Sequence, residues 1–392
     1  MASAECERAI EDAIRYGYAL VRHISPNDVG VTGSHMYGYY LPKHNDVWPL
    51  FTPHPPTKNS NDSHPIRITW QNGRVTESNV KWYGVGTRSE YRITGFGRKF
   101  PYISHGVVGN LLVLIPTEKQ KSFRGYVLDT EADFEEISAQ LAFDPVRDWT
   151  LYVHGVEQIE TEDECAEREF CEFAKGLEEF PTGEQFSERT WQLLQTCVSQ
   201  FETWPVDRAL VKCMATEFSM FKFVERQLCR AELLRPFASV DDFIATAQTL
   251  LQRRKSRAGR SLENHVEHYF KRAGIPHKMR PKISGKPDII VPGEAEYADP
   301  EFPVDKLFVI AVKTTCKDRW PQVLKEGNRI KKKHLLTFQK GMAITQLQEM
   351  ASANVQLVVP ESLHKLYPPR AKSGVEILTF QELIYAVMKA LH

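Results

Sequence analysis

Hydrophobic and polar positions follow two different patterns along this chain. In the first third, short segments rich in β-branched and aromatic residues are separated by clusters of Gly, Pro, Asn and Asp. Such segments are typical of strands that are joined by turns. We expect strands at 37–41, 66–70, 80–83, 111–115 and 149–153. This part of the chain is therefore predicted to be β-rich.

A helical period replaces this pattern from about Phe186 onward. It continues through 218–234 and 240–254, after which helices and strands alternate. We expect helices near 261–272, 321–333 and 380–391, and strands at 288–291, 307–314 and 355–359. Strands that alternate with helices indicate an α/β domain in which helices flank a central mixed sheet.

The length of 392 residues is enough for two or three domains. The change of pattern predicts a multidomain chain with a β-rich domain over 1–156 and an α/β domain over 183–392. Between them, 157–182 is an acidic segment that we interpret as a linker or a bridging helix.

Acidic and basic residues number 50 each, so the formal net charge is zero, but the two signs are segregated. Residues 253–286 hold 11 Lys and Arg against two Glu, a net charge of +9. Residues 157–179 hold 10 Asp and Glu against two Lys and Arg, a net charge of −8. The basic segment is compatible with a DNA-binding surface that the neutral total conceals, and each run is also compatible with a solvated face.

Seven cysteines are present and no pair has the CxxC spacing. We therefore expect neither a zinc site nor a disulfide framework, and we expect a reducing cytoplasm in a prokaryotic cell. The N-terminal segment lacks the apolar core of a secretory signal, and no apolar run reaches the roughly 18 residues of a membrane span. No membrane partner is expected.

Two polar side chains at the ends of apolar segments carry the candidate chemistry. Asp288 begins the apolar segment 288–291, and Lys313 follows the apolar run 308–312. Magnesium-dependent hydrolysis of a phosphodiester needs carboxylate oxygens for the hard Mg²⁺ ion and a cation near the attacking water and the phosphate. An Asp on one strand and a Lys on its neighbour supply both, as in the PD…(D/E)xK nuclease core.

The usual second carboxylate, two residues before the lysine, is replaced by Ala311. Glu326, 13 residues after Lys313 on the predicted helix that follows, is the candidate replacement. Glu263, on a helix that we expect to begin at Ser261, is a further carboxylate. The residues alone leave the alternative open that the aspartate is a strand-end turn residue and Glu263 a solvated helix residue.

Over most of its length the sequence resembles the EcoRII-type restriction endonucleases. The strongest similarity lies in 253–263, in Pro287-Asp288, in the run AVKTTCKDRW at 311–320 and in 357–365. In that family the metal site is permuted, with the second carboxylate after the lysine. The resemblance implies an active site of Asp288, Lys313 and Glu326 with Glu263 in support, in which Asp288 and Glu326 bind Mg²⁺.

Lys317, Asp318 and Arg319 follow the expected catalytic strand directly. Basic side chains donate to guanine O6 and N7, and a carboxylate accepts from cytosine N4, so this trio suits adjacent G·C pairs in the major groove. The resemblance implies that these residues read the two G·C pairs of each half-site. The alternative is a local salt bridge at a helix start.

The N-terminal third resembles the effector domain of the same family, a DNA-binding pseudobarrel. The matching residues cluster in 25–42 and 88–98. By analogy, the residues that face DNA are His35, Tyr40, Arg88, Glu90 and Arg92. Two departures leave details open. Tyr91 replaces a basic residue of the family, and 212–215 lacks the arginine that the family uses at a flipped central base pair.

The function that we expect is that of a type II restriction endonuclease. It makes Mg²⁺-dependent double-strand breaks in double-stranded DNA at a short pseudo-palindromic site with outer CC/GG pairs, as a homodimer. The N-terminal domain binds a second copy of the site and regulates cleavage. Two alternatives remain: a catalytically inactive, sequence-specific DNA-binding regulator, and a repair-type endonuclease. Binding in EDTA beside cleavage in Mg²⁺ separates the first alternative from the enzyme.

Overall fold

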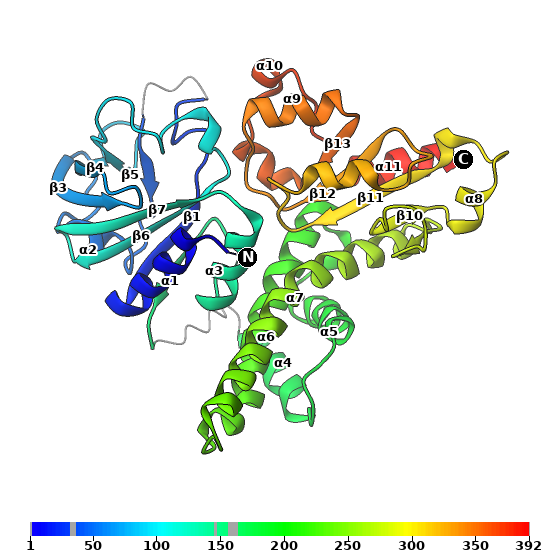
Figure 1. Cartoon of the computed structure of the whole chain (residues 1–392), viewed down its shortest axis with the longest axis horizontal. Coiled ribbons are helices and arrows are strands. Elements are labelled where there is room, and N and C mark those ends of the chain that lie inside the picture. The colour runs from blue at the N-terminus through cyan, green and yellow to red at the C-terminus, as the bar shows by residue number, and fades with distance from the viewer. Residues whose placement is uncertain (1, 32–36, 145–146, 156–163, 392) are drawn as a thin grey trace. The chain divides into compact units, whose positions relative to one another are not determined.

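The computed structural model describes residues 2–31, 37–144, 147–155 and 164–391 (Figure 1). The chain divides into two compact units. The first unit comprises 1–156 together with two segments from late in the sequence, 339–349 and 365–375. The second unit comprises 157–338, 350–364 and 376–392. Among the described residues, no helix is both long enough and apolar enough to cross a bilayer.

The described part of the first unit is built on an eight-stranded sheet in the order β2-β5-β4-β3-β7-β6-β1-β8. All neighbouring strands are antiparallel except the parallel pair of β3 and β7. The strands are β1 (Tyr18–His23), β2 (Tyr39–Leu41), β3 (Asn61–Trp70), β4 (Val75–Tyr83), β5 (Glu90–Thr94), β6 (Leu111–Glu118), β7 (Ser122–Leu128) and β8 (Trp149–Val153). The predicted β-rich fold of this region is confirmed.

Both faces of this sheet are covered by apolar clusters. Side chains from the strands and loops, among them Trp70, Trp82 and Phe51, form one cluster. On the other face, the helices α1 (Ala4–Tyr16) and α3 (Glu131–Gln140) pack against the sheet (Figure 1). Two short elements, α2 (Trp48–Phe51) and η1 (His105–Val107), lie in the loops. The β-rich pattern therefore folds around a core on each side of one sheet.

The described part of the second unit contains a five-stranded mixed sheet in the order β13-β12-β11-β10-β9. β10 is antiparallel to both of its neighbours, β9 and β11, whereas β11, β12 and β13 are parallel. The strands are β9 (Lys278–Met279), β10 (Ile289–Val291), β11 (Phe308–Lys313), β12 (Lys333–Thr337) and β13 (Val355–Val358). The predicted mixed sheet with flanking helices is confirmed.

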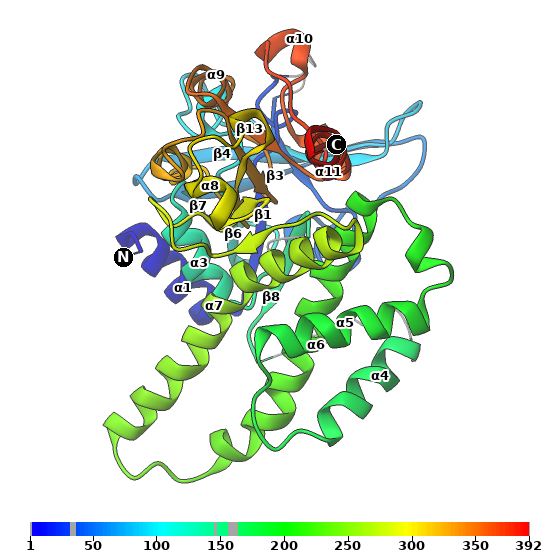
Figure 2. The same cartoon turned by 90° about the vertical axis from the view of Figure 1, so that its right-hand side faces the viewer.

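Two long helices, α6 and α7, form an extended pair beside this sheet (Figure 2). From residue 164 onward, the described α-helices are α4 (Glu164–Lys175), α5 (Gly183–Cys197), α6 (Val206–Leu234), α7 (Val240–Arg272), α8 (Glu294–Ala298), α9 (Ile344–Ser352), α10 (Arg370–Ser373) and α11 (Phe380–Leu391). The 3-10 helices are η2 (Phe201–Thr203), η3 (Val304–Lys306), η4 (Trp320–Lys325) and η5 (Glu361–Leu366).

Two sequence predictions of helices need correction, the first only in its starting residue and the second in most of its extent. The helix expected to begin at Ser261 is the second half of the continuous α7, and Ser261 is fully buried in its interior. Gly259 does not break α7, because one glycine lowers helix stability by only about 1 kcal/mol. The helix expected over 321–333 is the short η4, which is followed by Gly327 at φ +53° and then by β12. A positive φ is incompatible with continuing a right-handed helix.

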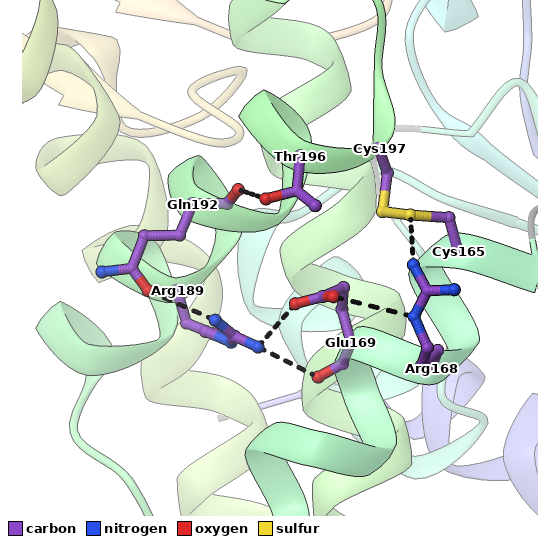
Figure 3. Close-up of a disulfide and its surroundings, with 7 residues drawn as sticks. All are labelled: Cys165, Arg168, Glu169, Arg189, Gln192, Thr196 and Cys197. Atoms are coloured by element: carbon purple, nitrogen blue, oxygen red, sulfur yellow. Dashed lines mark hydrogen bonds and ion pairs between the residues drawn. A yellow bond between two sulfur atoms is a disulfide. The ribbon is translucent and has the colours of Figure 1, made fainter.

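The expectation of no disulfide is also wrong. Cys165 of α4 and Cys197 at the end of α5 form a disulfide across 32 residues of sequence (Figure 3). The two helices are also joined by an ion pair of 2.7 Å between Arg189 and Glu169. Sequence spacing shows only whether cysteines are close along the chain, and this pair meets because α4 folds back on α5. Within the acidic segment, residues 164–175 form α4, the described residues 176–182 are not helical, and 157–163 lie outside the described residues.

Candidate active site

The ends of β10 and β11 bring the first two predicted catalytic residues together. Asp288 immediately precedes β10, Lys313 ends β11, and the two strands pair antiparallel with Ile289 opposite Ile310. The Lys313 Nζ donates to Asp288 Oδ2 at 2.9 Å and to Oδ1 at 3.3 Å. The backbone N–H of Val312 donates to Oδ2 at 2.7 Å. The register of one strand pair therefore positions both groups.

Glu326 lies just after η4 in extended backbone, with φ −82° and ψ 131°. Its residue is 7% exposed, and Oε2 is buried without a hydrogen-bond partner among the described residues. Burial, followed by the charge of Asp288, raises the pKa of Glu326 to about 7 against the opposing effects of Lys313 and Lys333. The predicted carboxylate is therefore part of the same electrostatic cluster as Asp288 and Lys313.

The fourth predicted residue, Glu263 of α7, joins this cluster through its charge. Burial, with a contribution from Asp288, raises the pKa of Glu263, and the Arg280 and Lys313 cations oppose that rise. The Arg280 guanidinium contacts Glu263 Oε2 at 2.8 Å through Nε and at 2.6 Å through Nη2. The Thr314 hydroxyl donates to the Ala258 carbonyl at 3.2 Å, which ties α7 to the end of β11.

Arg280 is a residue of this cluster that the sequence did not single out. It holds a positive φ of +45°, and its backbone N–H donates to the Asp288 carbonyl at 2.7 Å. The only signal in the sequence is its place in the basic run 253–286, which contains ten other cations. The contact of Arg280 with Asp288 depends on the pairing of β9 with β10, which the sequence pattern does not show.

The turn that carries Glu326 packs directly on the loop that precedes Asp288. The Gly327 N–H donates to the Ser284 carbonyl at 2.8 Å. Gly285 has φ +78°, and a Cβ on it would lie 2.1 Å from the Lys325 carbonyl oxygen. A side chain at 285 is excluded both by the backbone conformation and by this contact. The loop before Asp288 and the turn with Glu326, which hold the predicted metal carboxylates, therefore pack against each other.

The donor set fits a hard divalent cation in its chemistry. Asp288 and Glu326 supply carboxylate oxygens, and Glu326 Oε2 is a buried oxygen that no described group satisfies. The described residues nevertheless contain no group of three or more His, Cys, Asp or Glu side chains arranged to hold a metal ion. The oxygens of Asp288 are engaged by Lys313 and Val312, and Glu263 is engaged by Arg280.

The predicted base-reading trio lies between β11 and η4. Lys317 is buried, Arg319 is half-buried and Asp318 is exposed.

Near the region 212–215, which lacks an arginine, Arg257 of α7 approaches α6. Its guanidinium lies 4.6 Å from the ring centroid of Phe218.

The predicted DNA-facing residues of the first unit separate into two groups. Tyr40 of β2 and both Glu90 and Arg92 of β5 line one cavity of about 380 Å³. Arg92 is 1% exposed, and its guanidinium donates to the Gly38 carbonyl at 3.0 Å and to Glu90 at 3.2 Å.

Arg88 lies apart from this cavity, exposed in the loop before β5, with its guanidinium 6.0 Å from the ring centroid of Tyr83. His35 lies outside the described residues.

The chain resembles known proteins over almost its whole length. It is 31% identical over 398 residues to the type II restriction enzyme EcoRII of Escherichia coli, an alignment that covers 96% of this chain and 95% of the relative. The chain is a type II restriction endonuclease. Family models described as "EcoRII C terminal" and "Restriction endonuclease EcoRII, N-terminal" match residues 221–384 and 13–153, respectively. The chain belongs to the EcoRII family.

More distant similarities lie in part of the chain. The type II restriction enzyme SsoII of Shigella sonnei is 27% identical over 180 residues, which is 41% of this chain and 57% of that enzyme. Among solved structures, a PspGI complex with substrate DNA aligns with a TM-score of 0.45 and 17% identity, covering 54% of this chain and 93% of that one. A metal-depleted Ecl18kI complex with uncleaved, modified DNA aligns with a TM-score of 0.42 and 21% identity, covering 57% and 84%.

Proposed function

We propose that this enzyme cleaves both strands of double-stranded DNA at a short pseudo-palindromic site with outer CC/GG pairs, in a Mg²⁺-dependent reaction carried by Asp288, Lys313 and Glu326. The observation that supports this assignment is the Asp288–Lys313 contact of 2.9 Å at adjacent strand ends, together with a buried Glu326 carboxylate oxygen that has no hydrogen-bond partner among the described residues. Two carboxylates and an ammonium in this arrangement suit hydrolysis of a phosphodiester.

Asp288 and Glu326 are the residues that would hold Mg²⁺. When bound, the ion supplies Lewis-acid stabilisation of the phosphoryl charge and a water of lowered pKa. Glu263 adds negative charge beside these two ligands, and its ion pair with Arg280 keeps that charge compensated before the ion binds.

Lys313 acts as a charged donor in this proposal. Burial lowers the pKa of Lys313, but the Asp288 carboxylate outweighs that effect, with help from Glu326 and Glu263, so the net pKa lies above the ordinary value. The side chain is therefore an ammonium at neutral pH. An ammonium donates to the scissile phosphate and orients the attacking water, and it stabilises negative charge that develops on the phosphoryl oxygens.

Recognition is assigned to two regions. Lys317, Asp318 and Arg319 begin four residues after Lys313, the end of β11, and we assign to them the reading of the outer G·C pairs next to the scissile phosphate. The N-terminal domain binds a second copy of the site and regulates cleavage. A homodimer supplies two active sites, one for each strand of a pseudo-palindromic duplex.

Sequencing the ends of plasmid fragments produced in Mg²⁺ tests the proposal. We expect fragment ends at one recurring sequence with outer CC/GG pairs, and no fragments in EDTA. Ends at random sequences, or equal cleavage in EDTA, would refute it. Adding an oligonucleotide duplex that carries the site tests the regulatory part, because a change in the rate on a single-site plasmid is then expected.

A further inference from the structure

Lys333, the first residue of β12, is a buried cation beneath the turn that carries Glu326. The residue is 3% exposed, whereas its neighbours Lys331 and Lys332 are exposed. A buried ammonium is unfavourable unless it is paired. Here Nζ donates to the Gly327 carbonyl at 2.6 Å and also to the Ile330 carbonyl. The ammonium thus joins the two ends of the segment 327–330.

The main chain of Lys333 is fixed by the sheet. Its backbone N–H donates to the Asn354 carbonyl at 3.0 Å, and β12 pairs in parallel with both β11 and β13. Lys333 is also the residue opposite Val309 of β11, the strand that ends at Lys313. The sheet therefore fixes the backbone of Lys333 in β12, while the ammonium of the same residue binds the turn 327–330.

Other contacts also hold this turn: the Gly327 N–H donates to the Ser284 carbonyl at 2.8 Å, and Ile330 packs in one apolar cluster with Val309 of β11. The Lys333 ammonium adds a bond at each end of the segment 327–330. Gly327 has φ +53°, and its carbonyl also accepts the Ile330 N–H at 2.9 Å. Without the ammonium, the Gly327 carbonyl would keep that single bond, and the Ile330 carbonyl would lose its Lys333 donor.

We propose that Lys333 is a positioning residue, whose ammonium fixes the turn 326–330 on the sheet and thereby holds the Glu326 carboxylate beside Asp288. This inference rests on the proposed function, because it takes Glu326 as a ligand of the catalytic metal. A residue that orients a metal ligand typically changes metal affinity or activity by about 10- to 100-fold when it is removed.

The test compares full-length Lys333→Met with the matched control Lys332→Met, which removes an exposed lysine one residue away. Initial cleavage rates are measured against Mg²⁺ concentration, alongside DNA binding in EDTA and thermal unfolding. For Lys333→Met we expect half-saturation at a Mg²⁺ concentration at least about tenfold higher, with DNA binding unchanged. For Lys332→Met we expect the wild-type Mg²⁺ dependence.

Two further variants keep the outcome decisive. If Lys333→Met fails to fold, Lys333→Gln retains one donor for the carbonyls and is expected to lie between Met and wild type in Mg²⁺ dependence. Cleavage by Glu326→Gln at the wild-type rate would overturn the proposed function itself. An inactive Glu326→Gln beside a folded Lys333 variant with wild-type half-saturation would overturn only the positioning role, as would a loss of thermal stability without a change in half-saturation.

Discussion

The Lys313 ammonium contacts the Asp288 carboxylate at 2.9 Å across the ends of two antiparallel strands. The same carboxylate accepts the Val312 N–H at 2.7 Å, so its orientation is fixed by the strand backbone as well as by the cation. The ammonium also lies in the field of Glu326 and Glu263. One lysine therefore interacts with the charge of all three carboxylates that the proposed mechanism requires.

Removing the negative charge of Asp288 is expected to abolish cleavage while leaving the fold intact. In Asp288→Asn, the amide oxygen still accepts the Val312 N–H, but the metal ligand and the partner of Lys313 are lost. We expect a loss of plasmid cleavage of at least about a hundredfold. The matched control is Asp305→Asn, which changes an exposed aspartate of the same unit. Wild-type cleavage by Asp288→Asn would remove this residue from the site.

The pKa of Glu326 predicts an unusual dependence of stability on pH. Its ordinary value of 4.5 is raised to about 7 in the folded protein, chiefly by burial. Between these values the folded state holds a proton that the unfolded state has lost, so stability falls as pH rises through this window. Above pH 7 the buried carboxylate is ionised and the destabilisation is complete.

Glu326→Gln removes this titration and is therefore expected to be more stable than wild type in the absence of metal near pH 8, by on the order of 1–3 kcal/mol. Near pH 4 the two proteins should have nearly equal stability. Thermal unfolding at both pH values measures the difference, with the exposed Glu301→Gln as a control. Equal stability near pH 8 would contradict the raised pKa.

A side chain at Gly285 is expected to disrupt the contact between the two carboxylate-bearing loops. In Gly285→Ala, the Cβ would lie 2.1 Å from the Lys325 carbonyl oxygen and 2.5 Å from Glu326 Cα. Gly274→Ala is a matched control, because Gly274 also has a positive φ, of +66°, but nothing lies within 4 Å of its Cβ position. Both variants carry backbone strain of about 1–3 kcal/mol, and only Gly285→Ala should also lose cleavage.

The Cys165–Cys197 disulfide is expected to stabilise the docking of α4 on α5. For a loop of this size the chain-entropy contribution is about 2–4 kcal/mol. Cys165→Ser should lower the resistance of α4 to proteolysis, and reduction of the wild-type protein should have the same effect. Cys171→Ser removes a free cysteine of the same helix and serves as the control. If all these samples resist protease equally, the disulfide contributes nothing to this docking.

The sequence predicts the placement of a site residue well where that placement depends only on the strand that carries the residue. Asp288 and Lys313 are polar groups at the ends of apolar segments, so their placement follows from local pattern, while their contact depends on strand register. Glu326 was proposed from its position after Lys313 and then from the resemblance. Its predicted surroundings were wrong because Pro321 favours a helix start, whereas the positive φ of Gly327 ends the helical turn.

Other features depend on tertiary structure that no local pattern contains. Lys333 follows two exposed lysines, so the run at 331–333 resembles a solvated segment although its last member is buried. The disulfide joins cysteines that the spacing rules do not connect. Arg280 is one of many cations in a basic segment, and only the pairing of β9 with β10 brings it to Asp288.

The role of Lys313 in Mg²⁺-dependent cleavage is tested by incubating supercoiled plasmid in Mg²⁺ with the wild-type protein and with Lys313→Ala. We expect linear DNA from the wild type, none from the variant over the same time, and retained binding of the variant to cognate duplex in EDTA. Linear DNA at an equal rate from both proteins would contradict it.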